Sequence, residues 1–113
     1  MNIQIFGTKK CNDTKKTERF FKERGIKVQF IDMQKKGLSK GELTSVAAGN
    51  GGIMNLINPD AKDKDAVALL QYIADEEKLD KLIKNQQIIK TPVVRNGKQS
   101  TVGYHPAIWK TWE

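Results

Sequence analysis

The chain has 113 residues, near the commonest size of a single domain, and we expect one domain over residues 1–113. Its one cysteine excludes an intramolecular disulfide, and with a single histidine the sequence predicts no structural zinc site. The lone cysteine, the lack of a charged-then-apolar leader and the lack of an apolar run of about 18 residues favour a soluble, unprocessed cytoplasmic protein.

The formal net charge is +7, from 20 lysines and arginines against 13 aspartates and glutamates. Such an excess is typical of proteins that bind nucleic acid, acidic partners or anionic substrates. It also describes an ordinary solvated surface. No arginine-rich segment and no alternation of basic and aromatic residues accompanies it, so we expect neither direct nucleic-acid binding nor a membrane partner.

The first part of the chain predicts a strand–helix–strand unit. Ile3 and Ile5 lie on one face of the first strand, and Gly25 ends the helix because it adopts positive φ readily. Short connections between the elements predict parallel strands joined by a right-handed crossover. The three elements are a strand over residues 2–7, a helix from Cys11 or Asn12 to Arg24, and a strand over residues 26–31.

The segment from about residue 39 to 86 predicts a helical insert. Ser39 and Glu42 match a capping box that starts a helix running to about Ala48, and the Gly49–Gly52 turn breaks it. The remaining predicted elements are one helical turn over residues 53–57, a helix from Asp63 with Ala66, Leu69, Leu70 and Ile73 at helical spacing, and a helix capped by Asp75 that carries Leu79, Leu82 and Ile83 and stops at Asn85.

The last part of the chain predicts a hairpin followed by a helix. Val93 and Val94 begin a strand, and Asn96-Gly97 is the strongest short signal for a type I′ turn. The return strand covers residues 100–103. The final helix opens at Pro106, with Ile108, Trp109 and Trp112 expected to face the core. We therefore expect an α/β fold: a four-stranded mixed sheet with helices around it.

Cys11 is the first candidate for chemistry, because it directly precedes the first predicted helix. The first backbone N–H groups of a helix have no partner inside it and, with the helix dipole, stabilise an anion. Lys9 and Lys10, with Lys15 and Lys16 further on, add positive charge. These effects favour the reactive thiolate. The alternative is a small cysteine that fills space in the core.

The chain resembles the thioredoxin fold, and within it the glutaredoxin-dependent arsenate reductase family, which also contains the Spx transcription regulators. The resemblance covers the whole chain and rests on three features. They are the opening I-F-G-T-K-K-C-N-D-T, the helical insert between the second strand and the hairpin, and the ending I-K-T-P-V-V-R-N-G-K-Q-S-T-V-G-Y. It implies a bacterial protein with a cis Thr91–Pro92 peptide that faces Cys11.

The departures from this family concern its arginines. Arsenate reductases of this type hold the oxyanion with one arginine in the helical insert, one before the cis-proline and one before the proline that opens the last helix. Here Thr91 and His105 stand at the second and third places, and Asn55 lies near the first. Guanidinium groups match oxyanions, so these replacements argue against efficient arsenate reduction. Thr14 replaces the second cysteine of the C-x-x-C that Spx regulators often carry.

The resemblance implies catalytic roles for Cys11 and Thr14. The Thr14 hydroxyl either donates to the Cys11 sulfur or bonds the backbone of its own helix. Residues expected near a substrate are Lys9, Lys10, Asn12, Thr91, Pro92 and His105.

Other single residues have simpler interpretations. A catalytic role is one interpretation of His105, but a lone histidine before a helix is more often a local cap. Arg95 precedes the hairpin turn and is expected to be exposed. Trp109 and Trp112 are expected in the core rather than as a stacking platform.

Three functions remain open. The first is a thiol oxidoreductase that has no bound cofactor and uses glutathione as co-substrate, or glutaredoxin as partner, because no second cysteine can resolve a mixed disulfide. The second is a Spx-like regulatory module without enzymatic activity, which binds a protein such as an RNA polymerase subunit through Gly49–Gly52 and Met54. The third is an inactive relative with a residual cysteine.

Overall fold

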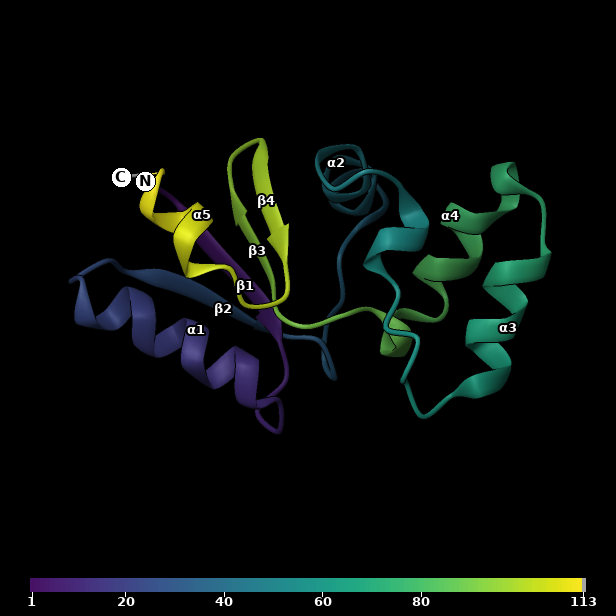
Figure 1. Cartoon of the computed structure of the whole chain (residues 1–113), viewed down its shortest axis with the longest axis horizontal. Coiled ribbons are helices and arrows are strands. Elements are labelled where there is room, and N and C mark those ends of the chain that lie inside the picture. The colour runs from purple at the N-terminus through teal and green to yellow at the C-terminus, as the bar shows by residue number, and fades with distance from the viewer. Residues whose placement is uncertain (113) are drawn as a thin grey trace.

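The computed structural model describes residues 1–112 and contains one four-stranded mixed sheet flanked by helices. Figure 1 shows the sheet with α1 and α5 in one half of the molecule and the helical insert in the other. The strands are β1 (Ile3–Gly7), β2 (Val28–Asp32), β3 (Val93–Asn96) and β4 (Gln99–Val102). The helices are α1 (Asn12–Glu23), α2 (Lys40–Gly49), η1 (Ile53–Leu56), α3 (Lys64–Tyr72), α4 (Asp75–Ile83), η2 (Gln86–Ile88) and α5 (Pro106–Lys110).

The strand order is β2-β1-β3-β4, with β1 parallel to β2 and antiparallel to β3. The alternation predicted for the first strand is confirmed. Ile3 and Ile5 pack on the face covered by α1 and α5, whereas Phe6 packs into the core of the insert. This arrangement confirms the thioredoxin-like α/β fold, with a helical insert between the βαβ unit and the ββα unit.

The core between the sheet, α1 and α5 is built around Trp109. Its ring lies 5.2 Å from the ring of Phe20 and 5.3 Å from that of Phe21, measured between centroids. Its buried indole N–H donates to Thr101 Oγ1 at 2.8 Å, which satisfies the one polar atom of the side chain. The core assignment of Trp109 is therefore confirmed. Ile108, also assigned to the core, is 44% exposed, because its neighbour in the short helix takes the inward position.

The helical insert begins where the capping box predicted. Ser39 Oγ accepts from the Glu42 backbone N–H at 3.2 Å, and Glu42 Oε1 accepts from the Ser39 backbone N–H at 2.8 Å. The helix ends at the predicted glycines, and Gly51 and Gly52 have φ values of 84° and 116°. Residues that carry a side chain rarely adopt such φ values, so this turn requires glycine.

Replacing Ser39 with alanine should lower the free energy of unfolding by about 1 kcal/mol, because an orphan N–H of α2 loses its acceptor. Urea denaturation measures the change. Ser45→Ala on the same helix is the matched control, and no hydrogen bond of its side chain occurs among residues 1–112. Equal losses in the two variants would contradict a capping role.

Two predictions of local structure are wrong. The hairpin turn is not Asn96-Gly97: Asn96 pairs with Gln99, so Gly97 and Lys98 form the loop. Only Gly97 has positive φ, at 62°, as in a type II′ turn. Asp75 does not cap α4, because Ala74 holds the cap position. The Asp75 carboxylate lies in the first turn, where it complements the helix dipole.

Arg95 is half-buried rather than exposed as expected. Its Nη1 donates to Gln4 Oε1 at 2.8 Å on β1 and lies 3.4 Å from Glu42 Oε2 on α2. The side chains of Arg95 and Glu42 are 17% and 27% exposed. This arginine therefore ties the insert to the sheet, so its role is structural.

Candidate functional site

The candidate site begins at the corner between β1 and α1. Cys11 precedes the helix as its N-cap residue and is partly exposed. Gly7 allows α1 to approach β1 closely: a Cβ atom at this position would lie 2.5 Å from Thr14 Oγ1 and 2.6 Å from Thr14 Cγ2. The end of β1 and the first turn of α1 together thus hold the cysteine at the helix start.

Thr91 reaches Cys11 from the other end of the chain. The Thr91–Pro92 peptide is cis, as the family resemblance implies, and Thr91 Oγ1 donates to Cys11 Sγ at 3.1 Å. The sulfur also lies 3.7 Å from the Thr91 carbonyl oxygen. The residue before the proline therefore contacts the thiol with both its side chain and its backbone.

The pKa of the Cys11 thiol is lower than that of a free cysteine. Burial is the largest single effect and raises the pKa, because it disfavours the charged thiolate. Hydrogen bonds to the sulfur outweigh it: the side chains of Thr14 and Thr91 contribute most, followed by the backbone N–H groups of Thr14 and Asp13. These two N–H groups belong to the first turn of α1, so the predicted effect of a helix start on the thiol is present.

Thr14 is fully buried and faces the cysteine. Its Oγ1 has no hydrogen-bond partner of regular geometry among residues 1–112, yet this hydroxyl lowers the pKa of the Cys11 thiol. The alternative, in which it bonds the backbone of its own helix, is not observed in the described structure. Thr17 on the same helix makes that kind of bond, from its Oγ1 to the Asp13 carbonyl at 2.7 Å. The Thr14 hydroxyl is thus buried without a backbone acceptor and close enough to the sulfur to lower the pKa of the Cys11 thiol.

Lys9 and Lys10 are exposed, and neither is among the groups that shift the pKa of Cys11. Replacing both with glutamine should therefore slow alkylation of Cys11 by at most about twofold at low salt, since surface charges are screened by solvent and ions. Iodoacetamide kinetics at two salt concentrations measure this. A tenfold loss would contradict the structure and show that the lysines activate the thiol.

A cavity of about 770 Å³ lies between the sheet and the insert, and it is lined by Thr91, which contacts Cys11, but not by Cys11 itself. Thr8 and Thr91 form the wall on the cysteine side, and Asn58, which the sequence reasoning missed, lies on the insert side. Asp63, also in the wall, accepts hydrogen bonds from the Ala66 backbone N–H and from Gln87, and these lower the pKa of its carboxyl group. The remaining residues around the cavity are Met33, Gln34, Asp60, Ala61, Lys62, Gln86, Gln87 and Ile89.

The insert side of the cavity is held in place by a short backbone pairing. Ile57 forms an isolated antiparallel bridge with Ile89. The Asn58 backbone N–H donates to the Ile88 carbonyl at 2.8 Å, and the Lys90 N–H donates to the Leu56 carbonyl at 2.8 Å. These bonds bring Asn58 beside the segment that leads from η2 to Thr91.

Comparison with known proteins assigns the chain to a family. The model of the ArsC family matches residues 6–112. The chain belongs to the ArsC family. This membership confirms the resemblance to arsenate reductases that the sequence motifs indicate.

The relatives of this ArsC-family protein are distant. The uncharacterised protein YusI of Bacillus subtilis (strain 168) is 22% identical over 108 residues, which cover 92% of each chain. An arsenate reductase from Vibrio cholerae superposes with a TM-score of 0.81 at 19% identity, over 96% of this chain and 94% of that one. The structure of SACOL0876 from Staphylococcus aureus COL gives a TM-score of 0.76 at 26% identity, over 96% of each chain.

Not every residue expected at the site lies there. The His105 ring Nε2 lies 2.7 Å from the Val102 carbonyl oxygen, and no contact with Cys11 occurs among the described residues. Asn55 donates to the Asn50 carbonyl at 2.9 Å and does not line the cavity. Asn12 is exposed at the start of α1. The structure thus brings together Cys11, Thr14 and the cis Thr91–Pro92 peptide, whereas His105 and Asn55 make other contacts. Asn12 directly follows Cys11, and its role near a substrate stays a prediction.

Two further findings bear on function. Among residues 1–112 no helix is long and apolar enough to cross a membrane. No group of three or more histidine, cysteine, aspartate or glutamate side chains in the same residues is arranged to hold a metal ion.

Proposed function

We propose that this ArsC-family protein is a thiol oxidoreductase in which Cys11 is the nucleophile and Thr14 and Thr91 stabilise its thiolate. The observation that carries the proposal is the 3.1 Å hydrogen bond to Cys11 Sγ from the hydroxyl of Thr91, a residue that also lines an open cavity. A thiol that only fills core space does not need hydroxyl donors, and burial alone would raise its pKa.

The reaction proceeds in two exchanges. The Cys11 thiolate attacks one sulfur of a substrate disulfide, forms a mixed disulfide with that half and releases the other half as a thiolate. A second thiolate, from glutathione or glutaredoxin, then attacks the mixed disulfide and regenerates the Cys11 thiolate. The half that is released first ends as a free thiol, and the half that Cys11 held leaves in a disulfide with the second thiol. When that half is glutathione and the second thiol is glutathione, the oxidised product is glutathione disulfide. An external thiol is required because the chain has no second cysteine.

The test is turnover of a glutathionylated peptide with reduced glutathione, with and without glutaredoxin. Wild-type protein should release the peptide thiol, and Cys11→Ser should be inactive. Intact-mass measurement should show one glutathione on Cys11 when reduced glutathione is withheld. Lack of this adduct and of turnover, at pH values above the pKa of the thiol, would overturn the proposal.

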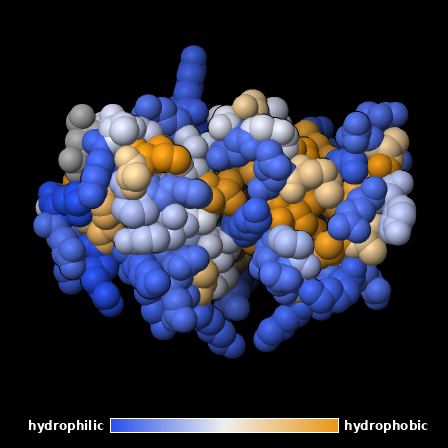
Figure 2. Space-filling model, viewed as in Figure 1, coloured by the Kyte–Doolittle hydropathy of each residue, from blue (hydrophilic) through white to orange (hydrophobic). Residues whose placement is uncertain are grey.

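A Spx-like regulatory role is the second candidate, and exposed apolar side chains on the insert support it. Figure 2 shows apolar surface over the insert, where Met54 and Leu69 are 39% and 40% exposed and Tyr72 is 86% exposed. Under this proposal the insert binds a protein such as an RNA polymerase subunit. Purified polymerase should then bind the wild type and Cys11→Ser equally, and Leu69→Ser/Tyr72→Ser should lose binding. An inactive thiol together with no polymerase binding would favour the third candidate, an inactive relative.

A further inference from the structure

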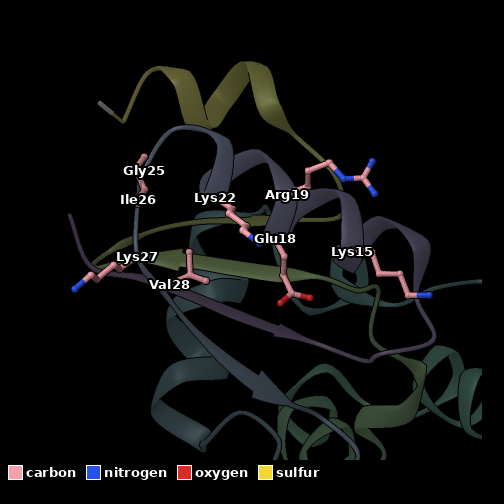
Figure 3. A pocket seen from close by; sticks show the side chains of 8 residues that line it. All are labelled: Lys15, Glu18, Arg19, Lys22, Gly25, Ile26, Lys27 and Val28. Carbon is pink, nitrogen blue, oxygen red and sulfur yellow. The ribbon is translucent and has the colours of Figure 1, made fainter.

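An open groove of about 700 Å³ runs along the outer side of α1, away from the cavity that Thr91 lines. Figure 3 shows Lys15, Glu18 and Lys22 along α1 and Val28 on the facing start of β2. Lys15, Glu18 and Lys22 are three and four residues apart, so they lie on one stripe of the helix. Arg19 lies on the neighbouring side of α1. The second wall of the groove is formed by Gly25, Ile26, Lys27 and Val28.

The groove is strongly basic. It is lined by four cations, Lys15, Arg19, Lys22 and Lys27, against the single carboxylate of Glu18. None of the four forms an ion pair or a side-chain hydrogen bond among residues 1–112. Their charge is therefore available to a ligand, and the complementary ligand is an anion long enough to span two turns of helix.

The second wall of the groove includes the start of β2, a strand at the edge of the sheet. β2 is the outermost strand and pairs only with β1 among the described residues. An edge strand directs alternate backbone N–H and C=O groups away from the sheet, where only another polypeptide can satisfy them in a regular ladder. Ile26 and Val28 are partly buried and add apolar contact in the groove.

Nucleic acid fits this surface less well than a polypeptide. No aromatic side chain lines the groove, so it has no platform on which bases stack. Glu18 projects into the groove between the cations and repels a continuous phosphate backbone. An acidic peptide can place an apolar or polar side chain opposite Glu18, which a phosphodiester chain cannot do.

We propose that this groove binds an extended acidic segment of a partner protein, which lies along α1 beside the free edge of β2. One end of the groove is at Lys15, whose backbone N–H donates to the Cys11 carbonyl at 3.2 Å. A bound segment that continues past Lys15 therefore runs toward the N-terminal end of α1, which Cys11 precedes. The binding itself does not depend on the thiol, so the inference is independent of the proposed oxidoreductase activity.

The probe is a fluorescein-labelled peptide of alternating glutamate and valine, which is acidic and extended, and the protein is Cys11→Ser so that no thiol chemistry contributes. Fluorescence anisotropy measures affinity at low salt. The groove variant is Arg19→Glu/Lys22→Glu, which reverses two exposed charges. The matched control, Lys84→Glu/Lys98→Glu, changes the net charge equally at exposed positions outside the groove. Thermal denaturation checks that both variants fold.

The groove variant should bind the peptide about tenfold more weakly than its parent, since two attractions become two repulsions, whereas the control should lose less than about threefold. Amide shifts on labelled protein should cluster on α1 and β2. The proposal fails if the peptide does not bind, or if both variants lose affinity equally. It also fails if a single-stranded oligonucleotide of equal charge binds more tightly than the peptide and depends on the same groove residues.

Discussion

Replacing Thr91 with valine should slow alkylation of Cys11 about tenfold at neutral pH. The thiolate loses the donor that lies 3.1 Å from its sulfur, and a hydrogen bond to a charged group contributes about 1.5–3 kcal/mol, less at sulfur. Burial, which raises the pKa of the thiol, remains unchanged by the substitution. Iodoacetamide kinetics between acid and alkaline pH measure both the rate and its dependence on pH.

Thr91→Val should also shift the pH dependence of the alkylation rate, because the lost hydrogen bond lowers the pKa of the Cys11 thiol. In the wild type, hydrogen bonds to the thiolate hold the pKa of Cys11 below its ordinary value, so the rate reaches its plateau at lower pH than for a free thiol. In Thr91→Val the inflection should move to higher pH. Thr17→Val is the control, because it removes a buried hydroxyl of α1 that bonds the Asp13 carbonyl instead of the sulfur. Equal shifts in the two variants would mean that Thr91 acts only through general destabilisation.

The elements that sequence reasoning predicted well depend on neighbouring residues. The capping box at Ser39 and Glu42 joins residues three apart, and Gly25 ends α1 with a φ of 69° as its position indicated. The alternation of Ile3 and Ile5 sets the face of β1 without reference to any distant part of the chain. These features are predictable from the sequence because the residues that produce them are close together in the chain.

The features that sequence reasoning missed depend on distant partners. Arg95 is half-buried because it bonds Glu42, which is 53 residues away in the sequence. Asn58 lines the cavity because Ile57 pairs with Ile89 across the insert. No periodic pattern in the sequence predicts a single β-bridge of this kind. The hairpin differs by one residue in register, since pairing of Asn96 with Gln99 outweighed the preference of Asn-Gly for the loop positions.

The candidate site was predicted in part for the same reason. The position of Cys11 before a helix is a local signal, and its reactivity could be argued from the helix start alone. The approach of Thr91 to Cys11 spans 80 residues and came only from the family resemblance. Adjacency in the sequence predicts that the lysines activate the thiol, but the groups that lower its pKa are the hydroxyls of Thr14 and Thr91 and two backbone N–H groups.

Arsenate should bind this protein weakly and should not be turned over efficiently. No arginine lines the cavity: Thr91, which contacts the thiol, stands before the cis-proline, and Asn58 lies on the insert side. His105 is engaged with the Val102 carbonyl and does not replace a guanidinium at the cysteine. The remaining group that attracts an oxyanion is the start of α1. Its hydrogen bonds to an oxyanion are less directional than those of an arginine guanidinium group.

The variant Asn58→Arg/Thr91→Arg should raise arsenate affinity by about a hundredfold or more over the wild type. Each guanidinium supplies a charge-assisted hydrogen bond of about 1.5–3 kcal/mol, and two of them multiply the binding constant accordingly. Isothermal titration with arsenate measures the gain. Thr91→Arg also removes the hydroxyl that supports the thiolate, so arsenate binding should recover more than turnover.

The control variant Asn58→Lys/Thr91→Lys adds equal charge without the planar guanidinium group, so its arsenate affinity should rise less. If the lysine variant gains as much as the arginine variant, charge alone limits arsenate binding. Wild-type turnover at the level of a true arsenate reductase would show instead that the helix start and its exposed lysines suffice for the oxyanion.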